Sequence, residues 1–261
     1  MRLSIKSRLR YDVRSPTTFI LAIQAAGTSG DQTLLSEAIK LPAGLEADFF
    51  VDNLGPNRFV RFLAQPGTVE VSYRAVVEKA PLADQRPFVG SAVVSDLPPA
   101  VLPYLQPSRY CQSDLLSGFA EREFRRLPQG LGQAQAVADW IAGHVDYRLG
   151  ASTGTTSAID TFVERVGVCR DFAHLGAALC RALDLPARVA ACYAWRLRPQ
   201  DFHAVFQVFL GGVWTTFDAT RMAPLEGLVQ IGVGRDAADV AFASYFGRAS
   251  LEDKEISVEA G

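Results

Sequence analysis

The chain has 261 residues, of which 49% are hydrophobic, and a formal net charge of −2 at pH 7. This length and composition can build one large core or two ordinary ones, which indicates a globular protein. The 26 basic residues nearly balance the 28 acidic ones. With no basic or acidic surplus, we expect neither a nucleic acid nor a membrane as a partner.

The start of the chain bears on its location. Residues 1–15 alternate apolar and charged side chains, whereas a secretory signal has an unbroken apolar run of roughly 7 to 15 residues. We therefore expect a cytoplasmic protein. The four cysteines are then expected to be free thiols, because disulfides belong to oxidising compartments. They are Cys111, Cys169, Cys180 and Cys192.

The first hundred residues have the period of β-strands. Val69, Val71 and Tyr73 alternate with polar residues in TVEVSYRAVVE, as in a half-buried strand. Similar segments lie at residues 2–13, 17–26 and 57–65, separated by Gly, Pro, Asn and Asp. The pattern predicts an antiparallel β-sandwich.

Residues 94–116 contain four prolines, which favours an extended segment that connects two domains. This divides the chain into a β-rich domain, residues 1–105, and a second domain, residues 106–261. Beyond the prolines the period becomes helical. Ser113 is predicted to cap one helix, and Val137, Trp140, Ile141 and His144 have the spacing of a second.

The second domain continues with two helices and three strands. Ser157 and Asp160 predict a capped helix over SAIDTFVER, and another helix begins at Cys169 and ends before Pro186. Strands follow at 187–195, 203–210 and 213–220. The predicted fold class is therefore α+β, with helices packed on an antiparallel sheet behind the N-terminal sandwich.

Cys169 stands in the first turn of its helix, where the helix dipole and unpaired backbone N–H groups favour the thiolate. It is either a nucleophile or a small buried hydrophobic residue. Cys180 lies mid-helix and Cys192 in an apolar strand, so we interpret both as core residues.

A nucleophilic cysteine needs a base, and the chain has three histidines. His144 falls on the apolar face of its helix. His174 is five residues after Cys169, about 140° around the helix from the thiol, which favours a structural hydrogen bond. His203, at the start of a strand, is the candidate base.

The Gly-Gly hairpin LGGVW fixes the partner of His203. If Leu210 pairs with Val213, His203 lies opposite Thr220 and diagonal to Asp218, with Cα atoms roughly 7 to 8 Å apart on one face. The sequence thus predicts a Cys169–His203–Asp218 triad, in which His203 takes the thiol proton and Asp218 orients the imidazole.

These segments resemble a known family. GVCRDFAHLGAALCRALDLPARVAACY and DFHAVFQVFLGGVWTTFDAT are similar to the catalytic segments of the bacterial transglutaminase-like superfamily, whose core is related to papain-type cysteine proteases. The first half resembles the β-rich domain found ahead of this core in one bacterial subfamily. The resemblance implies catalytic roles for Cys169, His203 and Asp218.

The chain departs from many relatives at Val205 and Ala219, where they have tryptophan and proline; neither position supplies a reacting group. For the oxyanion, the backbone N–H of Cys169 is one candidate donor. No second donor can be assigned; Trp140, Tyr193 and Trp195 are candidates that we favour as core residues.

The resemblance implies a hydrolase that acts on peptide or carboxamide bonds of a peptide or protein through an acyl-enzyme. A transamidase with the same triad is the alternative, and a non-catalytic peptide-binding module is a second. We expect no cofactor and no calcium dependence, since no D-x-[DN]-x-[DN]-G pattern occurs. A metal site of Cys169, His174 and His203 is disfavoured by the position of His174. Arg235, Asp236 and Asp239 either line the cleft or, as we favour, cap a helix.

Overall fold

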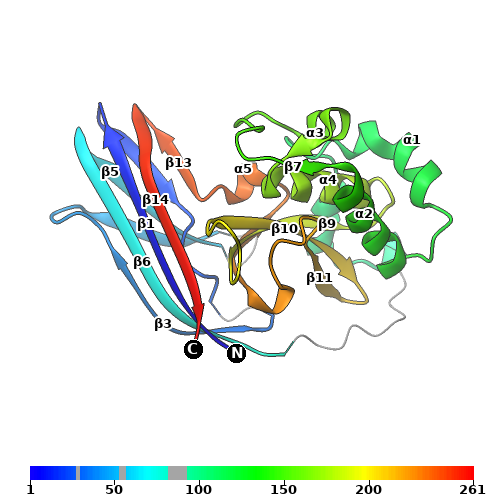
Figure 1. Cartoon of the computed structure of the whole chain (residues 1–261), viewed down its shortest axis with the longest axis horizontal. Coiled ribbons are helices and arrows are strands. Elements are labelled where there is room, and N and C mark those ends of the chain that lie inside the picture. Colours follow the sequence, from blue (N-terminus) through cyan, green and yellow to red (C-terminus); the bar gives the residue numbers. More distant parts are fainter. Residues whose placement is uncertain (28–29, 53–56, 82–92) are drawn as a thin grey trace.

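The computed structural model describes residues 1–27, 30–52, 57–81 and 93–261. They form two parts side by side (Figure 1): a β-sandwich, and a helical half, residues 93–242, in which helices pack on a third sheet. The architecture is α+β, as the sequence predicts. Both termini lie at one end of the sandwich, where the Gly261 N–H donates to the Arg2 carbonyl.

Two antiparallel four-stranded sheets make the sandwich. Sheet I has the order β14-β1-β6-β3 and sheet II the order β13-β2-β5-β4. The bounds are β1 Arg2–Val13, β2 Thr17–Leu21, β3 Gln32–Lys40, β4 Ala47–Val51, β5 Arg58–Ala64, β6 Gly67–Lys79, β13 Ala243–Phe246 and β14 Ala249–Ala260.

The predicted sandwich is confirmed because its strands bury alternate residues. β1 and β6 point every second side chain into the space between the sheets. There Phe19 packs on Tyr11 and on Phe62, with ring centroids 4.9 and 5.3 Å apart. The four segments predicted as strands correspond to β1, β2, β5 and β6.

The end of the chain differs from the prediction. The sequence placed all of residues 106–261 in the second domain, but β13 pairs with β2, and β14 pairs with β1 from Leu3↔Ala260 to Val13↔Ala249. Residues 243–260 therefore belong to the sandwich. β14 is an edge strand that fully buries only Ile256 and Val258, so its sequence lacks the alternation that reveals a strand.

The helical half is built on sheet III, with the antiparallel order β11-β10-β9-β12. Its bounds are α1 Ser113–Phe124, α2 Leu131–His144, β7 Asp146–Tyr147, α3 Ala158–Glu164, β8 Val166–Gly167, α4 Cys169–Arg181, β9 Ala187–Ala194, β10 Phe202–Leu210, β11 Val213–Phe217, β12 Leu228–Gly234 and α5 Ala237–Val240. None of the described helices is long and apolar enough to span a membrane.

Two local expectations were wrong here. Ser113 is the first residue of α1, and the N-cap position before it is occupied by Gln112, with no side-chain capping bond. The proline-rich segment forms two 3-10 helices, η1 (Val94–Asp96) and η2 (Pro99–Leu105). Pro99 begins η2, because the fixed φ of proline also suits the first helical position. Ser157 does cap α3, and its N–H donates to Asp160 Oδ2 over 2.9 Å.

Close packing fixes α4 on sheet III and sheet III on the sandwich. At Gly176 of α4 an added Cβ would lie 2.5 Å from the Phe206 ring of β10, so only glycine fits. On the sandwich side, Tyr193, Val229 and Ile231 of sheet III are part of the core that fills the sandwich. Sheet III thus contacts α4 in one hydrophobic core and the sandwich in another, and this packing sets the position of α4 relative to the sandwich.

Candidate active site

Cys169 is the first residue of α4, where the sequence placed it, and its side chain is partly exposed. Cys111, Cys180 and Cys192 are buried. Burial raises the pKa of Cys111 and of Cys192 to about 12, and raises the pKa of Cys180 above its usual range. Cys169 is therefore the thiol available to a substrate.

Three residues next to Cys169 fix the start of α4. The Val168 N–H donates to Asp171 Oδ2 over 2.9 Å, and Asp171 is fully buried. At Gly167 an added Cβ would lie 2.8 Å from the Asp171 Cβ, so the chain can turn into the helix only with glycine there. A bond of this kind satisfies a backbone N–H next to a helix start.

His203 and Asp218 meet as the hairpin register predicts. β10 and β11 pair from Leu210↔Val213 to Phe206↔Phe217, and His203 Nε2 lies 2.9 Å from Asp218 Oδ2. The other carboxylate oxygen, Oδ1, accepts the Thr220 hydroxyl at 2.7 Å and the Thr220 N–H at 3.0 Å. The carboxylate is thereby held with one oxygen facing the imidazole.

The imidazole also interacts with the Cys169 thiol. Among the described residues none gives His203 Nδ1 a hydrogen bond of regular geometry, but the Cys169 thiol is near enough to act on the ring. Burial lowers the pKa of His203, and the bond to Asp218 together with the Cys169 thiol outweighs it, so the pKa rises to about 10. Burial likewise raises the pKa of Asp218, but the bonds from His203 and Thr220 bring it below its usual value.

Tyr147 is a fourth residue at this site, and the sequence analysis missed it. It ends β7, which pairs in parallel with β8 as Tyr147↔Gly167, and its phenol lies against both the backbone N–H and the thiol of Cys169. Burial and the negative charge available at Cys169 raise the pKa of Tyr147 to about 12. A two-residue strand has no sequence period, so no signal could have placed this phenol.

Arg170 ties the loop after Tyr147 to the start of α4. Its Nη2 donates to Ser152 Oγ and to the Thr153 carbonyl, each over 2.6 Å, and contacts Asp171 Oδ1 at 3.1 Å. The loop is therefore held beside the thiol.

His174 faces away from the thiol and makes the structural hydrogen bond that the sequence favours. Its Nε2 accepts the Ala237 N–H at 3.1 Å, and Tyr110 stacks on its ring. Burial lowers the pKa of His174 to about 3. Asp236 caps α5 through the Ala238 N–H, which confirms the capping interpretation of that segment.

The remaining candidates are packing residues. Tyr193 is buried in the sandwich core, Trp140 stacks on Phe162 beside the exposed His144, and Trp195 lies under Arg196. Within the described ranges, no three His, Cys, Asp or Glu side chains are grouped to hold a metal ion.

A thiol at a helix start, an imidazole on a following strand and a carboxylate after the next strand define a cysteine-centred site on an α+β core. Comparisons assign the family. The profile of the transglutaminase-like superfamily matches residues 119–219, and that of the bacterial transglutaminase N-terminal domain matches residues 1–100. The chain belongs to the transglutaminase-like superfamily.

Two relatives illustrate this membership. The structure of a candidate cysteine protease from Cytophaga hutchinsonii is similar with a TM-score of 0.94 and 45% identity, over 99% of this chain and 90% of that one. An uncharacterized protein of Mycobacterium leprae, ML0607, is 29% identical over 146 residues, which are 52% of each chain. The match therefore spans about half the length of that curated relative.

Proposed function

We propose that the protein is a cysteine hydrolase that cleaves peptide or carboxamide bonds through Cys169, His203 and Asp218. The observation that carries the proposal is the buried His203–Asp218 bond of 2.9 Å, next to the one partly exposed thiol, Cys169, which interacts with the imidazole. Family membership and the likeness to a candidate cysteine protease support it.

In the first step the Cys169 sulfur attacks the carbonyl carbon of the substrate while the thiol proton passes to His203 Nδ1. Asp218 stabilises the imidazolium that forms and keeps the ring in place. Because the His203 pKa is raised to about 10, the imidazolium persists at neutral pH until the leaving group needs its proton.

The attacked carbonyl oxygen becomes an oxyanion, which requires donors. We assign the Cys169 backbone N–H and the Tyr147 phenol, which lie close together. The incoming oxygen accepts the Cys169 N–H and the phenolic O–H of Tyr147. Donors aimed at a developing charge are usually the largest contribution to such catalysis.

The C–N bond then breaks, and the amine or ammonia leaves with the proton from His203, which gives a thioester on Cys169. Water attacks the thioester, His203 takes a proton from it, and the acid leaves as the thiol is restored. If a primary amine attacks instead, the product is a new amide. The same site thus allows both outcomes, and the second reactant decides between them.

The test is to incubate the full chain with a glutamine-containing peptide, with and without a primary amine, and to follow product masses. We expect hydrolysis products that vanish in Cys169→Ala and His203→Asn. His144→Asn is the matched control, since His144 is exposed and outside the site. Turnover retained by Cys169→Ala would contradict the proposal, and amine incorporation would identify a transamidase.

A further inference from the structure

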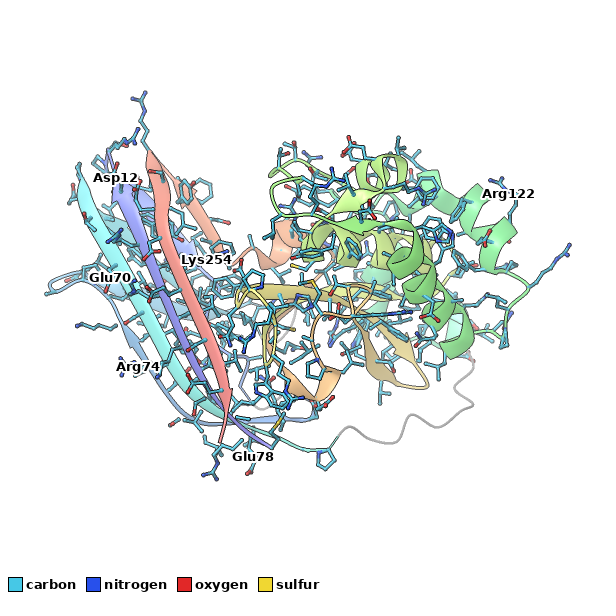
Figure 2. All side chains as sticks on the ribbon, in the orientation of Figure 1. Asp12, Glu70, Arg74, Glu78, Arg122 and Lys254 are labelled. Carbon is cyan, nitrogen blue, oxygen red and sulfur yellow. The ribbon has the colours of Figure 1, made fainter. Side chains whose placement is uncertain are left out.

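One inward-facing position of β14 carries a charged side chain. The pairing of β14 with β1 sets Lys254 opposite Leu9, which is fully buried. Residues opposite each other in a sheet share a face, so Lys254 points into the molecule, two residues before the buried Ile256. In Figure 2 it lies on the side of sheet I that faces the helical half. A lysine at such a position needs a partner.

Asp201 of the helical half is that partner. The Lys254 ammonium contacts its carboxylate at 2.6 Å, and the two side chains are 29% and 38% exposed. The ammonium also lies over the Phe242 ring, 5.9 Å from the centroid. Beside this pair, Gln200 Oε1 accepts the Val258 N–H at 3.0 Å. β14 therefore holds two successive residues of the segment that leads into β10.

Asp201 lies close to the reacting groups. Its Oδ1 accepts the Phe202 N–H at 2.6 Å, and His203 is the next residue. Because two residues span at most about 7 Å, the Cα atom of Asp201 lies within that distance of the His203 Cα atom. Burial and Cys169 raise the pKa of Tyr147 to about 12, and the Asp201 carboxylate adds to this rise. A carboxylate at this place opposes a developing oxyanion unless its charge is balanced.

We propose that Lys254 is a positioning residue of the active site, which balances the charge of Asp201 while Asp201 holds the start of β10. Without Lys254, a partly buried carboxylate would remain next to the site with no counter-charge. The inference rests on the proposed function and extends it, because the sandwich then contributes a side chain to the electrostatics of the reaction.

The test reads the electrostatic potential at Cys169 without substrate turnover. The full chain is labelled at pH 7 with iodoacetamide, which is neutral, and with iodoacetate, which is an anion. Peptide mass spectrometry gives both labelling rates of Cys169, and their ratio cancels the intrinsic reactivity of the thiol. In Lys254→Met we expect the iodoacetate-to-iodoacetamide ratio to fall by about threefold or more at low salt, and by much less at about 0.5 M NaCl.

Further variants separate charge from packing. Lys254→Arg keeps the positive charge and should keep the ratio. Lys254→Met combined with Asp201→Asn removes both charges but leaves an oxygen that can accept the Phe202 N–H, so it should restore the ratio. Asp201→Asn alone leaves the lysine unbalanced and should raise it. The matched control is Lys6→Met, at an exposed position of β1, which should leave the ratio unchanged.

Turnover of a neutral peptide should follow the same order. In Lys254→Met we expect kcat to fall while KM stays, and the added Asp201→Asn should restore kcat. An unchanged labelling ratio in Lys254→Met would overturn the proposal. A fall that Asp201→Asn does not restore, or that persists at high salt, would also overturn it, because Lys254 would then be only a structural tether. Failure of the proposed function is a separate result, in which the labelling ratios follow the expected order but no peptide is cleaved.

Discussion

At the scale of single residues, Tyr147 is the proposed oxyanion donor that lies next to the nucleophile Cys169. Because its phenol lies against the Cys169 N–H and thiol, Tyr147→Phe removes one O–H and keeps the ring. We expect kcat to fall by about two orders of magnitude, while iodoacetamide still labels Cys169. Labelling is read by peptide mass spectrometry. Unchanged kcat would assign the oxyanion to other donors.

Asp218 sets the proton affinity of His203, so it should set the basic limb of the pH–rate profile. The leaving group needs the imidazolium, and the bond to Asp218 helps to raise the His203 pKa to about 10. Asp218→Asn should therefore move the basic limb of kcat/KM to lower pH by about 1 to 3 units. Thr220→Val, which keeps the carboxylate, should shift it far less. A limb that stays in place would exclude this role.

The same pair makes stability depend on pH. The His203 pKa is raised from about 6.5 in the unfolded chain to about 10. The contribution of His203 to the free energy of unfolding is therefore complete below about pH 6.5 and is lost as pH rises toward 10. The Asp218 pKa is lowered, so its contribution is lost only in acid.

The stability that His203→Gln removes, measured by urea unfolding, should consequently be larger at pH 6 than at pH 9. The exposed His144→Gln is the comparison. An equal loss at both pH values would show that no proton is held more tightly by the folded chain.

At the scale of elements, the turn from β8 into α4 depends on Gly167. In Gly167→Ala the new Cβ meets the Asp171 Cβ at 2.8 Å, so we expect a loss of about 1–3 kcal/mol of unfolding free energy and slower labelling of Cys169. Gly143→Ala makes the same change in α2, where nothing lies within 4 Å, and should stabilise by up to about 1 kcal/mol. Urea unfolding of both variants measures the two changes in unfolding free energy. Equal changes would contradict the steric argument.

An element can be predicted from the sequence when the residues that determine its position lie close together along the chain. The Gly-Gly turn fixes the register of β10 and β11, so Asp218 could be placed beside His203 from the sequence. Tyr147 could not, because β7 meets β8 through two residues only. β14 could not either, since its partner β1 lies at the other end of the chain and little of it is buried.

At the scale of the whole molecule, the sandwich shares its hydrophobic core with sheet III of the helical half. Val229 and Ile231 of β12 are buried in the sandwich core. From the other side, Lys254 of β14 contacts Asp201 at 2.6 Å, two residues before His203. Parts that bury each other's surface lose stability together, so the fold should unfold as one cooperative unit.

A substitution in the sandwich can test this unit, because all three tryptophans, Trp140, Trp195 and Trp214, lie in the helical half. Val71→Ala removes two buried methyl groups in β6 and should cost about 2 kcal/mol. If the parts are coupled, the unfolding free energy measured by tryptophan fluorescence falls by the whole of this loss, and the urea midpoint falls with it, although Val71 is in the other part. Val163→Ala, at an exposed position, should leave the midpoint in place. A fluorescence midpoint unchanged by Val71→Ala would mean that the helical half unfolds alone, and that the sandwich supports the active site only by contact.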